Sequence, residues 1–538
     1  MSESAADVPP AAAGVGARTR RRGVGAAALV ALGILLSRLT GLVRQSVFAH
    51  YLGNSATAGA FTAALRIPNF LQNLFGEGAL SASFIPVYAG LLARGEREEA
   101  SRVAAAVGAL LALLVAVIVA VGVAATPFLV DVLAPGFEGG TRDLTVRLVR
   151  VLFPGVGLLV LSAWCLGILN SHRRFFLSYA APVVWNAAMI GVLLWFGGRE
   201  GEAALAVRLA WGAVVGSALQ FAIQLPSVFR LAGPLRPALH AVGADVRVVV
   251  RNFLPSFVSR GIVQISAFVD SIIGSLISAA AVAALGYAQS IYTLPVSLFG
   301  MAVSAAELPA MSSAVGSAAE IGAYLRGRLD AGLQRIAFFV VPSAVAFAAL
   351  GDLIAAALFQ GGRFGRADAL WVWGILAGSA VGLLAATMGR LYSSTYYALR
   401  DTRTPLRFAA VRVALGSAAG YLLAVPAPRA LGLDPAWGAA GLTLASGVVA
   451  WLEYALLRRA LNARIGHTGL RLGYAARVWG AAGLAARAAW GLRIAAPPLH
   501  PKVTALLVLV AFGAAYGLAA LALRVPEARG LVRRVLRR

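Results

Sequence analysis

The sequence has few of the residues on which soluble enzymes depend for catalysis. Its 538 residues include one cysteine and five histidines, and only 13% are charged. The single cysteine, Cys165, allows no disulfide within the chain and no cysteine metal site, and its apolar surroundings predict a buried side chain. No glycine-rich loop precedes Lys-Ser or Lys-Thr, and no histidine and carboxylate cluster has metal-ligand spacing. We therefore expect no catalytic residue, no metal and no cofactor, and a protein that is not an enzyme.

Long polar stretches are also scarce, and this scarcity sets the class of the protein. Hydrophobic residues make up 60% of the chain, and the mean hydropathy is +0.80, far above the range of soluble domains. The net charge of +25 does not indicate nucleic-acid binding, because the arginines are scattered between apolar segments and form no basic domain. These features predict an all-α polytopic membrane protein with no nucleic-acid partner.

Apolar runs of about 20 residues predict about fourteen transmembrane helices. The expected spans are 24–50, 58–91, 103–130, 144–170, 177–198, 203–231, 249–278, 281–312, 333–359, 368–398, 405–426, 435–461, 473–495 and 502–523. Arginines are concentrated in the loops that follow even-numbered helices, for example at Arg173 and Arg174, and in both terminal tails. Since cytoplasmic loops carry an excess of positive charge, both termini are expected in the cytoplasm.

An internal repeat predicts how these helices are grouped. Ser37-Arg38 and Ser259-Arg260 each precede a similar series of Pro, Phe-Gly, Ser-Ala and Pro residues at comparable spacing. An even number of helices between the copies makes the repeats parallel, as in alternating-access transporters. We therefore expect a disordered basic tail and two pseudo-symmetric six-helix lobes, followed by helices 13 and 14 with a basic tail. The corresponding ranges are 1–23, 24–233, 234–462 and 463–538.

Two arginines in the first expected span predict a binding site for an anion. Counted from Val24, Arg38 lies about 20 Å into an apolar core that is about 30 Å thick, so its side chain should face protein, water or an anion. Ser37, Gly41 and Arg44 share one helical stripe, and the two small residues leave room for a head group beside the arginine.

Further charged and polar residues extend this predicted site. Arg66, Asn73 and Glu77 fall on one stripe of the second span, where Glu77 is expected to hold a cavity arginine between cargo cycles. Arg260 is expected to face Arg38 across a central cavity. The alternative for all of these charges is a set of structural ion pairs between packed helices. Asp270, an acid in the middle of the seventh span, is the candidate site for a coupling cation or proton, with a structural arginine partner as its alternative.

The chain resembles the MurJ (MviN) family of lipid II flippases in several segments whose order and spacing match. These segments are Leu36–Arg44, Arg66–Leu71, Phe75–Ser81, Ala134–Phe137, Gly167–Asn170 and Tyr396–Pro405. The resemblance implies fourteen helices in two lobes, within the superfamily that includes multidrug and toxin exporters. It also implies outward transport of undecaprenyl-diphosphate-linked peptidoglycan precursor across the bacterial inner membrane, by a monomer that contacts membrane lipids and works beside cell-wall synthesis proteins. Guanidinium groups match the diphosphate with paired hydrogen bonds, so the resemblance makes the arginines substrate ligands.

The chain departs from the family pattern at charged positions, which leaves the substrate open. Gln72 and Asn73 stand where the family has an arginine pair, Gln45 where it has an acid, and Gln289 and Ser290 where it has Asp-Arg. The alternatives are a flippase for another polyprenyl-linked glycan, a small-molecule exporter of the same superfamily, and a scaffold that transports nothing. Transport would draw on the membrane potential or on a monovalent cation gradient.

Overall fold

The computed structural model describes residues 32–536 except 34, 73, 75–79, 234–242 and 498, and for 67–68, 70–72, 81–82, 254–267 and 534–536 it describes the backbone alone. Within these residues the regular elements are helices, and the β pairing is a single bridge between Gly361 and Phe364. The first helix covers residues 35–52. The elements that follow are α2 (Ala56–Gln72), α3 (Ser81–Ala93), α4 (Arg97–Ala124), α5 (Thr126–Leu133), α6 (Gly139–Ser171), α7 (Phe175–Phe196), α8 (Glu202–Ala232), α9 (Ala244–Ile277), α10 (Ala279–Pro295), the π-helical η2 (Val296–Met301), α11 (Ala302–Ser312), α12 (Ala318–Phe359), α13 (Arg366–Ala398), α14 (Arg403–Ala424), α15 (Pro426–Ala430), the 3-10 helix η3 (Pro435–Trp437), α16 (Gly438–Ile465), α17 (Leu472–Ala495), α18 (Pro501–Ala522) and α19 (Pro526–Leu536).

Ten helices in the described part of the chain are long and apolar enough to cross a membrane. The predicted all-α multi-pass class is therefore confirmed, while the count of fourteen spans stays a prediction. Two expected spans are interrupted: 103–130 breaks at Ala125, between α4 and α5, and 281–312 contains the π-helical segment η2. Pro295 comes directly before η2 and lacks a backbone N–H, which favours a local change of helix type.

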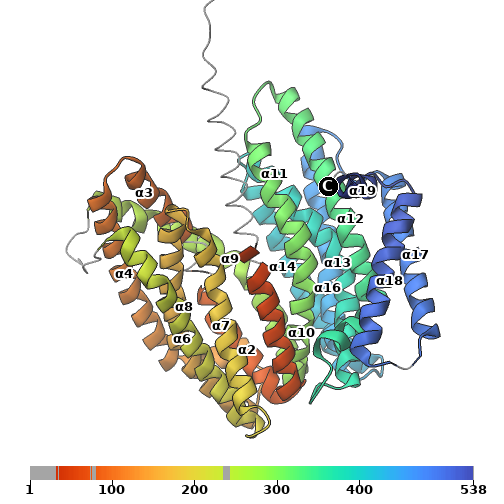
Figure 1. Cartoon of the computed structure of the whole chain (residues 1–538), viewed down its shortest axis with the longest axis horizontal. Coiled ribbons are helices and arrows are strands. Elements are labelled where there is room, and N and C mark those ends of the chain that lie inside the picture. The colour runs from red at the N-terminus through yellow and green to blue at the C-terminus, as the bar shows by residue number, and fades with distance from the viewer. Residues whose placement is uncertain are drawn as a thin grey trace, which may run out of the picture. The chain divides into compact units, whose positions relative to one another are not determined.

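Helices of the chain gather in two compact units, each described here by itself. The first unit comprises Met1–Arg44, Ala64–Thr126 and Arg147–Gln264. Its α4, α6, α7 and α8 lie side by side (Figure 1), and a hydrophobic cluster from α3, α4, α6 and α8 includes Trp164 and the buried Cys165, as predicted for this cysteine.

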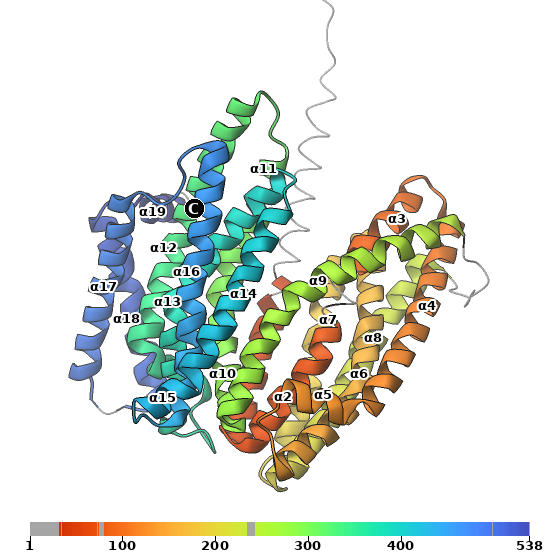
Figure 2. The same ribbon diagram turned by 180° about the vertical axis from the view of Figure 1, so that it is seen from behind.

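The second unit comprises Gln45–Ala63, Pro127–Val146 and Ile265–Arg538. In it α13 packs along both α12 and α16, and α17 and α18 form a hairpin packed on α12 (Figure 2). These units are groups of residues in contact rather than stretches of chain. The predicted domain boundaries at 233/234 and 462/463 therefore stay predictions.

Three helices end at an arginine with a left-handed backbone. Arg173, Arg400 and Arg524 have φ angles of 59°, 60° and 58° and are the non-glycine residues with positive φ among those described. In each case the N–H of the following residue bonds to the carbonyl five residues before it, as in a Schellman motif, where glycine is usual. These arginines follow α6, α13 and α18, which end at the side predicted to be cytoplasmic.

Candidate functional site

The predicted site on the first helix lies along α7 in the first unit. A Cβ atom at Gly33 would come within 2.8 Å of the Cβ of Tyr179, so glycine lets the two helices approach closely. Further along, Asn186 Nδ2 lies 3.5 Å from Thr40 Oγ1, and the Asn186 amide also borders Gly41. Residue numbers rise together on both helices, so the two helices run in the same direction.

Arg44 lies on an aromatic side chain of α7. Its guanidinium carbon is 4.9 Å from the centroid of the Trp185 ring, a cation–π distance, and Nη1 lies 3.6 Å from the Met189 sulfur. The Trp185 indole N–H donates to the Ala213 carbonyl of α8 at 3.0 Å, which fixes the ring that supports the arginine. Arg44 is half-buried, and within the described residues no carboxylate pairs with it. Since a thioether is a weak acceptor, most of the five guanidinium donors are left for an anion.

The neighbouring predicted residues on the first helix are less constrained. Arg38 is exposed, and among the described residues it has no hydrogen-bond or ion-pair partner. Ser37 is half-buried, and its carbonyl accepts a hydrogen bond from Thr40 Oγ1 at 3.1 Å. The space that we expected at Gly41 borders Asn186, so the stripe of Ser37, Gly41 and Arg44 partly faces α7.

The other predicted site residues are described only in part. Arg66 is a half-buried residue of α2. Asn73 and Glu77 lie outside the described residues, as does the side chain of Arg260, whose backbone belongs to α9. Their substrate-binding roles therefore stay predictions, as does the expected convergence of Arg38 and Arg260.

Asp270 belongs to a group of charged residues within the second unit. Its side chain is exposed on α9, and Tyr292 of α10 lies within electrostatic range of Asp270, Arg390 and Arg412. Arg412 of α14 pairs with Glu453 of α16, at 3.2 Å between Nη1 and Oε2. Sequence reasoning missed this pair, although one arginine and one glutamate inside two consecutive expected spans were a usable signal.

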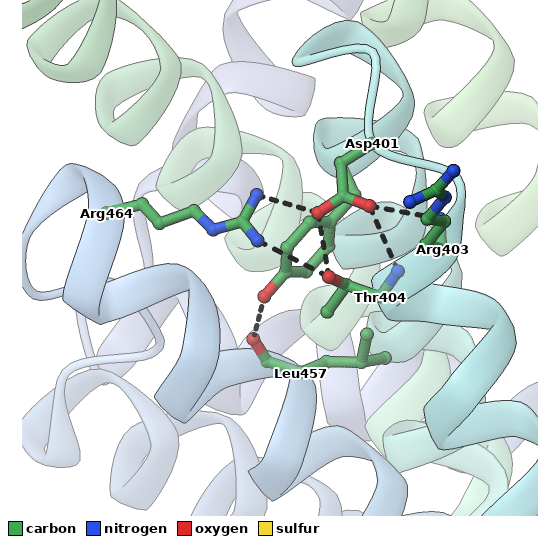
Figure 3. A network of polar contacts seen from close by, with 6 residues as sticks. Asp401, Arg403, Thr404, Leu457 and Arg464 are labelled. Atoms are coloured by element: carbon green, nitrogen blue, oxygen red, sulfur yellow. Dashed lines mark hydrogen bonds and ion pairs between the residues drawn. The ribbon is translucent and has the colours of Figure 1, made fainter.

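The conserved-looking segment Tyr396–Pro405 forms a structural network between helix ends (Figure 3). Asp401 accepts hydrogen bonds from the backbone N–H groups of Arg403 and Thr404, both at 3.0 Å, and from the Thr404 hydroxyl at 2.7 Å. Arg464 of α16 completes an ion pair with Asp401 at 2.7 Å. The hydrogen bonds from Thr404, with a smaller contribution from Arg464, lower the pKa of Asp401 to about 2. This carboxylate joins α13, α14 and α16 and is satisfied by protein groups.

Within the described part of the chain, no three His, Cys, Asp or Glu side chains converge as a metal site requires. The geometry instead offers a supported arginine in a membrane helix, which is suited to an anion.

The chain matches one protein family over most of its length. The family described as "Lipid II flippase MurJ" matches residues 48–510. A relative from Rhizobium tropici, named probable lipid II flippase MurJ, is 31% identical over 424 residues, covering 78% of this chain and 76% of that protein. The lipid II flippase MurJ of Burkholderia cenocepacia is 30% identical over 439 residues, covering 80% of this chain and 82% of that protein.

Two solved structures share the fold. A structure of lipid II flippase MurJ in an inward closed conformation matches with a TM-score of 0.74 and 22% identity, covering 94% of this chain and 99% of that chain. An inward-facing multidrug resistance MATE family transporter of the MOP superfamily matches with a TM-score of 0.65 and 17% identity, covering 79% and 95%. The resemblance found in the sequence is therefore confirmed.

Proposed function

Because the chain belongs to the MurJ lipid II flippase family, we propose that it carries lipid-linked peptidoglycan precursor from the cytoplasmic to the outer leaflet by alternating access. It is a multi-pass membrane protein. We place it in the bacterial inner membrane with both termini in the cytoplasm, acting as a transporter without catalytic residues. Membrane lipids are its surroundings, and we expect a monomer that works beside cell-wall synthesis proteins.

Arg44 is the observation that carries this proposal. A diphosphate must cross the apolar core with about two negative charges, and a guanidinium binds phosphate oxygens through paired, charge-assisted hydrogen bonds. Arg44 is held in position by Trp185, and its contacts leave donors for such a ligand. Arg38 lies six residues earlier, about 9 Å along the helix, and supplies a second cation on the path.

The driving force that we propose is the membrane potential. A negative interior favours outward movement of an anion by about 2.3 kcal/mol per charge per 100 mV across the full field. Asp270 is the candidate for an additional coupling cation or proton, because it is an exposed acid on α9 near Tyr292.

Complementation of a bacterium depleted of its own lipid II flippase tests the function. The wild-type chain should restore growth, and Arg44→Ala should abolish rescue at unchanged protein level. Arg44→Lys should rescue in part, because an ammonium cannot reproduce the planar fork. The matched control is Arg208→Ala, which removes another arginine of the first unit that lies 5.2 Å from an aromatic ring, that of Phe196, and should rescue fully.

Normal rescue by Arg44→Ala would remove this arginine from the site. Failure of the wild-type chain, in a strain that accepts a related flippase, would favour transport of another polyprenyl-linked glycan. Gln289 and Ser290 give that second candidate its support, since they make hydrogen bonds only with Thr293 and Tyr287 among the described residues and add no charge.

A further inference from the structure

Helix α17 lies in register along α12 in the second unit. The Tyr474 hydroxyl donates to the Gln334 carbonyl at 2.8 Å, and the Trp490 indole donates to the Ala349 carbonyl at 3.3 Å. Arg493 forms a two-pronged ion pair with Asp352 near the same end as Trp490. The numbers of the paired residues differ by 140 or 141 at each contact, so the two helices run parallel at the same depth. Because α12 is a candidate membrane span, α17 crosses the same layer.

The opposite side of α17 carries arginines among glycines. Residues three or four positions apart form one exposed stripe, which we name the outer α17 face and which consists of Gly473, Arg477, Gly480, Leu484, Arg487 and Gly491. A shallow groove of about 760 Å³ follows this stripe and extends to Leu523 after α18. In Figure 1, α17 lies at the edge of the second unit.

Arg487 lies close to the middle of the membrane. It is fifteen residues beyond Leu472 in a helix of 24 residues, so it lies about 5 Å from the midpoint of a helix about 36 Å long. Lipid phosphates lie outside an apolar core about 30 Å thick and are too far away for its side chain to reach. Arg477, five residues after Leu472, lies close enough to the interface to reach them, and its Nε donates to the Gly473 carbonyl at 3.0 Å. Within the part of the chain that the structure describes, Arg487 has no ion-pair or hydrogen-bond partner.

We propose that the outer α17 face binds a transmembrane helix of another protein, which places a carboxylate beside Arg487. An arginine at this depth requires an opposite charge or water, and the groove shows where the oppositely charged helix lies. Gly480 and Gly483 let the backbone of that helix approach closely, as small residues do at helix contacts in membranes. This inference does not depend on which molecule the chain transports.

A second copy of the chain does not fit this surface. Neither α17 nor α18 contains an aspartate or a glutamate. A twofold contact through the outer α17 face would set Arg487 against its own symmetry mate, with no carboxylate between them. The charge pattern therefore selects a different, acidic helix.

Photo-crosslinking of the full chain in its native membrane tests the proposal. The crosslinking amino acid replaces Leu484 on the outer α17 face, and the control site is Leu518, a 69% exposed residue of α18. We expect position 484, and not 518, to give an adduct with a transmembrane peptide that contains Asp or Glu near its middle. Arg487→Leu should lower the adduct yield about tenfold or more, because a buried charge would lose its partner. Arg477→Leu, the matched change at the interface, should leave the yield within about twofold.

A charge exchange completes the test. Changing the partner's acid to its amide should lower the yield as Arg487→Leu does, and Arg487→Glu combined with an arginine at the partner's acid should restore it. Adducts with lipid alone, with a second copy, or with a segment that lacks a central acid would overturn the proposal. It would also be overturned by an unchanged yield in Arg487→Leu, or by a yield at position 484 no higher than at 518. Because the readout is an adduct, it is independent of transport activity.

Discussion

Asp401 shows how a single carboxylate can hold three helix ends in a membrane protein. We expect Asp401→Ala to lower the free energy of unfolding by about 1 kcal/mol, because two backbone N–H groups at the start of α14 lose their acceptor. Asp401→Asn should cost less, since the amide oxygen still accepts those bonds and only the partly exposed ion pair with Arg464 is lost. Thermal unfolding of the purified protein in detergent measures both variants, and an equal loss would show that the ion pair dominates.

The pH dependence of this contact follows from the lowered pKa. With a folded pKa of about 2, the contribution of Asp401 is fully present above the unfolded value of about 3.9 and is lost as the pH falls through 2. Between pH 5 and pH 8 the difference between wild type and Asp401→Asn should therefore stay constant.

Arg44 marks the limit of sequence reasoning at this scale. Its depth and charge were predictable, because a helix rises by a fixed distance per residue and hydrocarbon excludes an unpaired cation. Its contact with Trp185 was not, since it depends on how two helices separated by about 140 residues pack. The same holds for Asn186 beside Gly41.

At the scale of helices, α13 and α16 approach closely where two glycines meet. A Cβ atom at Gly382 would overlap the backbone of Gly447, so there is no flexible side chain that could move aside. Gly382→Val should destabilise the fold by about 1–3 kcal/mol, the usual range for overpacking. Gly389→Ala is the matched control on the same helix, because its Cβ would lie 3.8 Å from the Leu457 side chain, an ordinary contact. Thermal unfolding in detergent should separate the two, and equal stability would contradict the close approach.

Helix positions were predictable because a run of apolar residues long enough to cross a bilayer leaves the backbone no alternative to a helix. The start of α7 was expected at 177 and is at Phe175, and α18 was expected at 502 and begins at Pro501. A search for apolar runs cannot find the short amphipathic helix α19, whose Val525–Ala528 end is buried while Leu531 is exposed. It also cannot locate η2, because a change of helix type leaves the hydropathy unaltered.

At the scale of the whole molecule, the structure relates the two ends of parallel helices. Since the first helix and α7 run in the same direction, the start of the first helix and the loop before Phe175 lie on one side. We predict that this side is the cytoplasm. In a Cys165→Ser background, Arg174→Cys should react with an impermeant maleimide only after permeabilisation, whereas Gly201→Cys, before α8, should react in intact cells. Strong labelling of position 174 from outside would reverse the topology.

The left-handed arginines have a consequence for how the molecule is made. An arginine in this conformation costs about 1 kcal/mol relative to glycine, while a cation at a helix carboxyl end gains about 0.3–1 kcal/mol, so the finished fold is nearly indifferent to the choice. Replacing Arg173, Arg400 and Arg524 with glycine together should leave the melting temperature of correctly inserted protein almost unchanged. The fraction of newly made chains inserted upside down should rise, as protease mapping of the loops would show. A clear loss of melting temperature would mean that these arginines act in the folded state. Otherwise their effect is spent during synthesis, and no measurement on the purified protein would reveal why they are there.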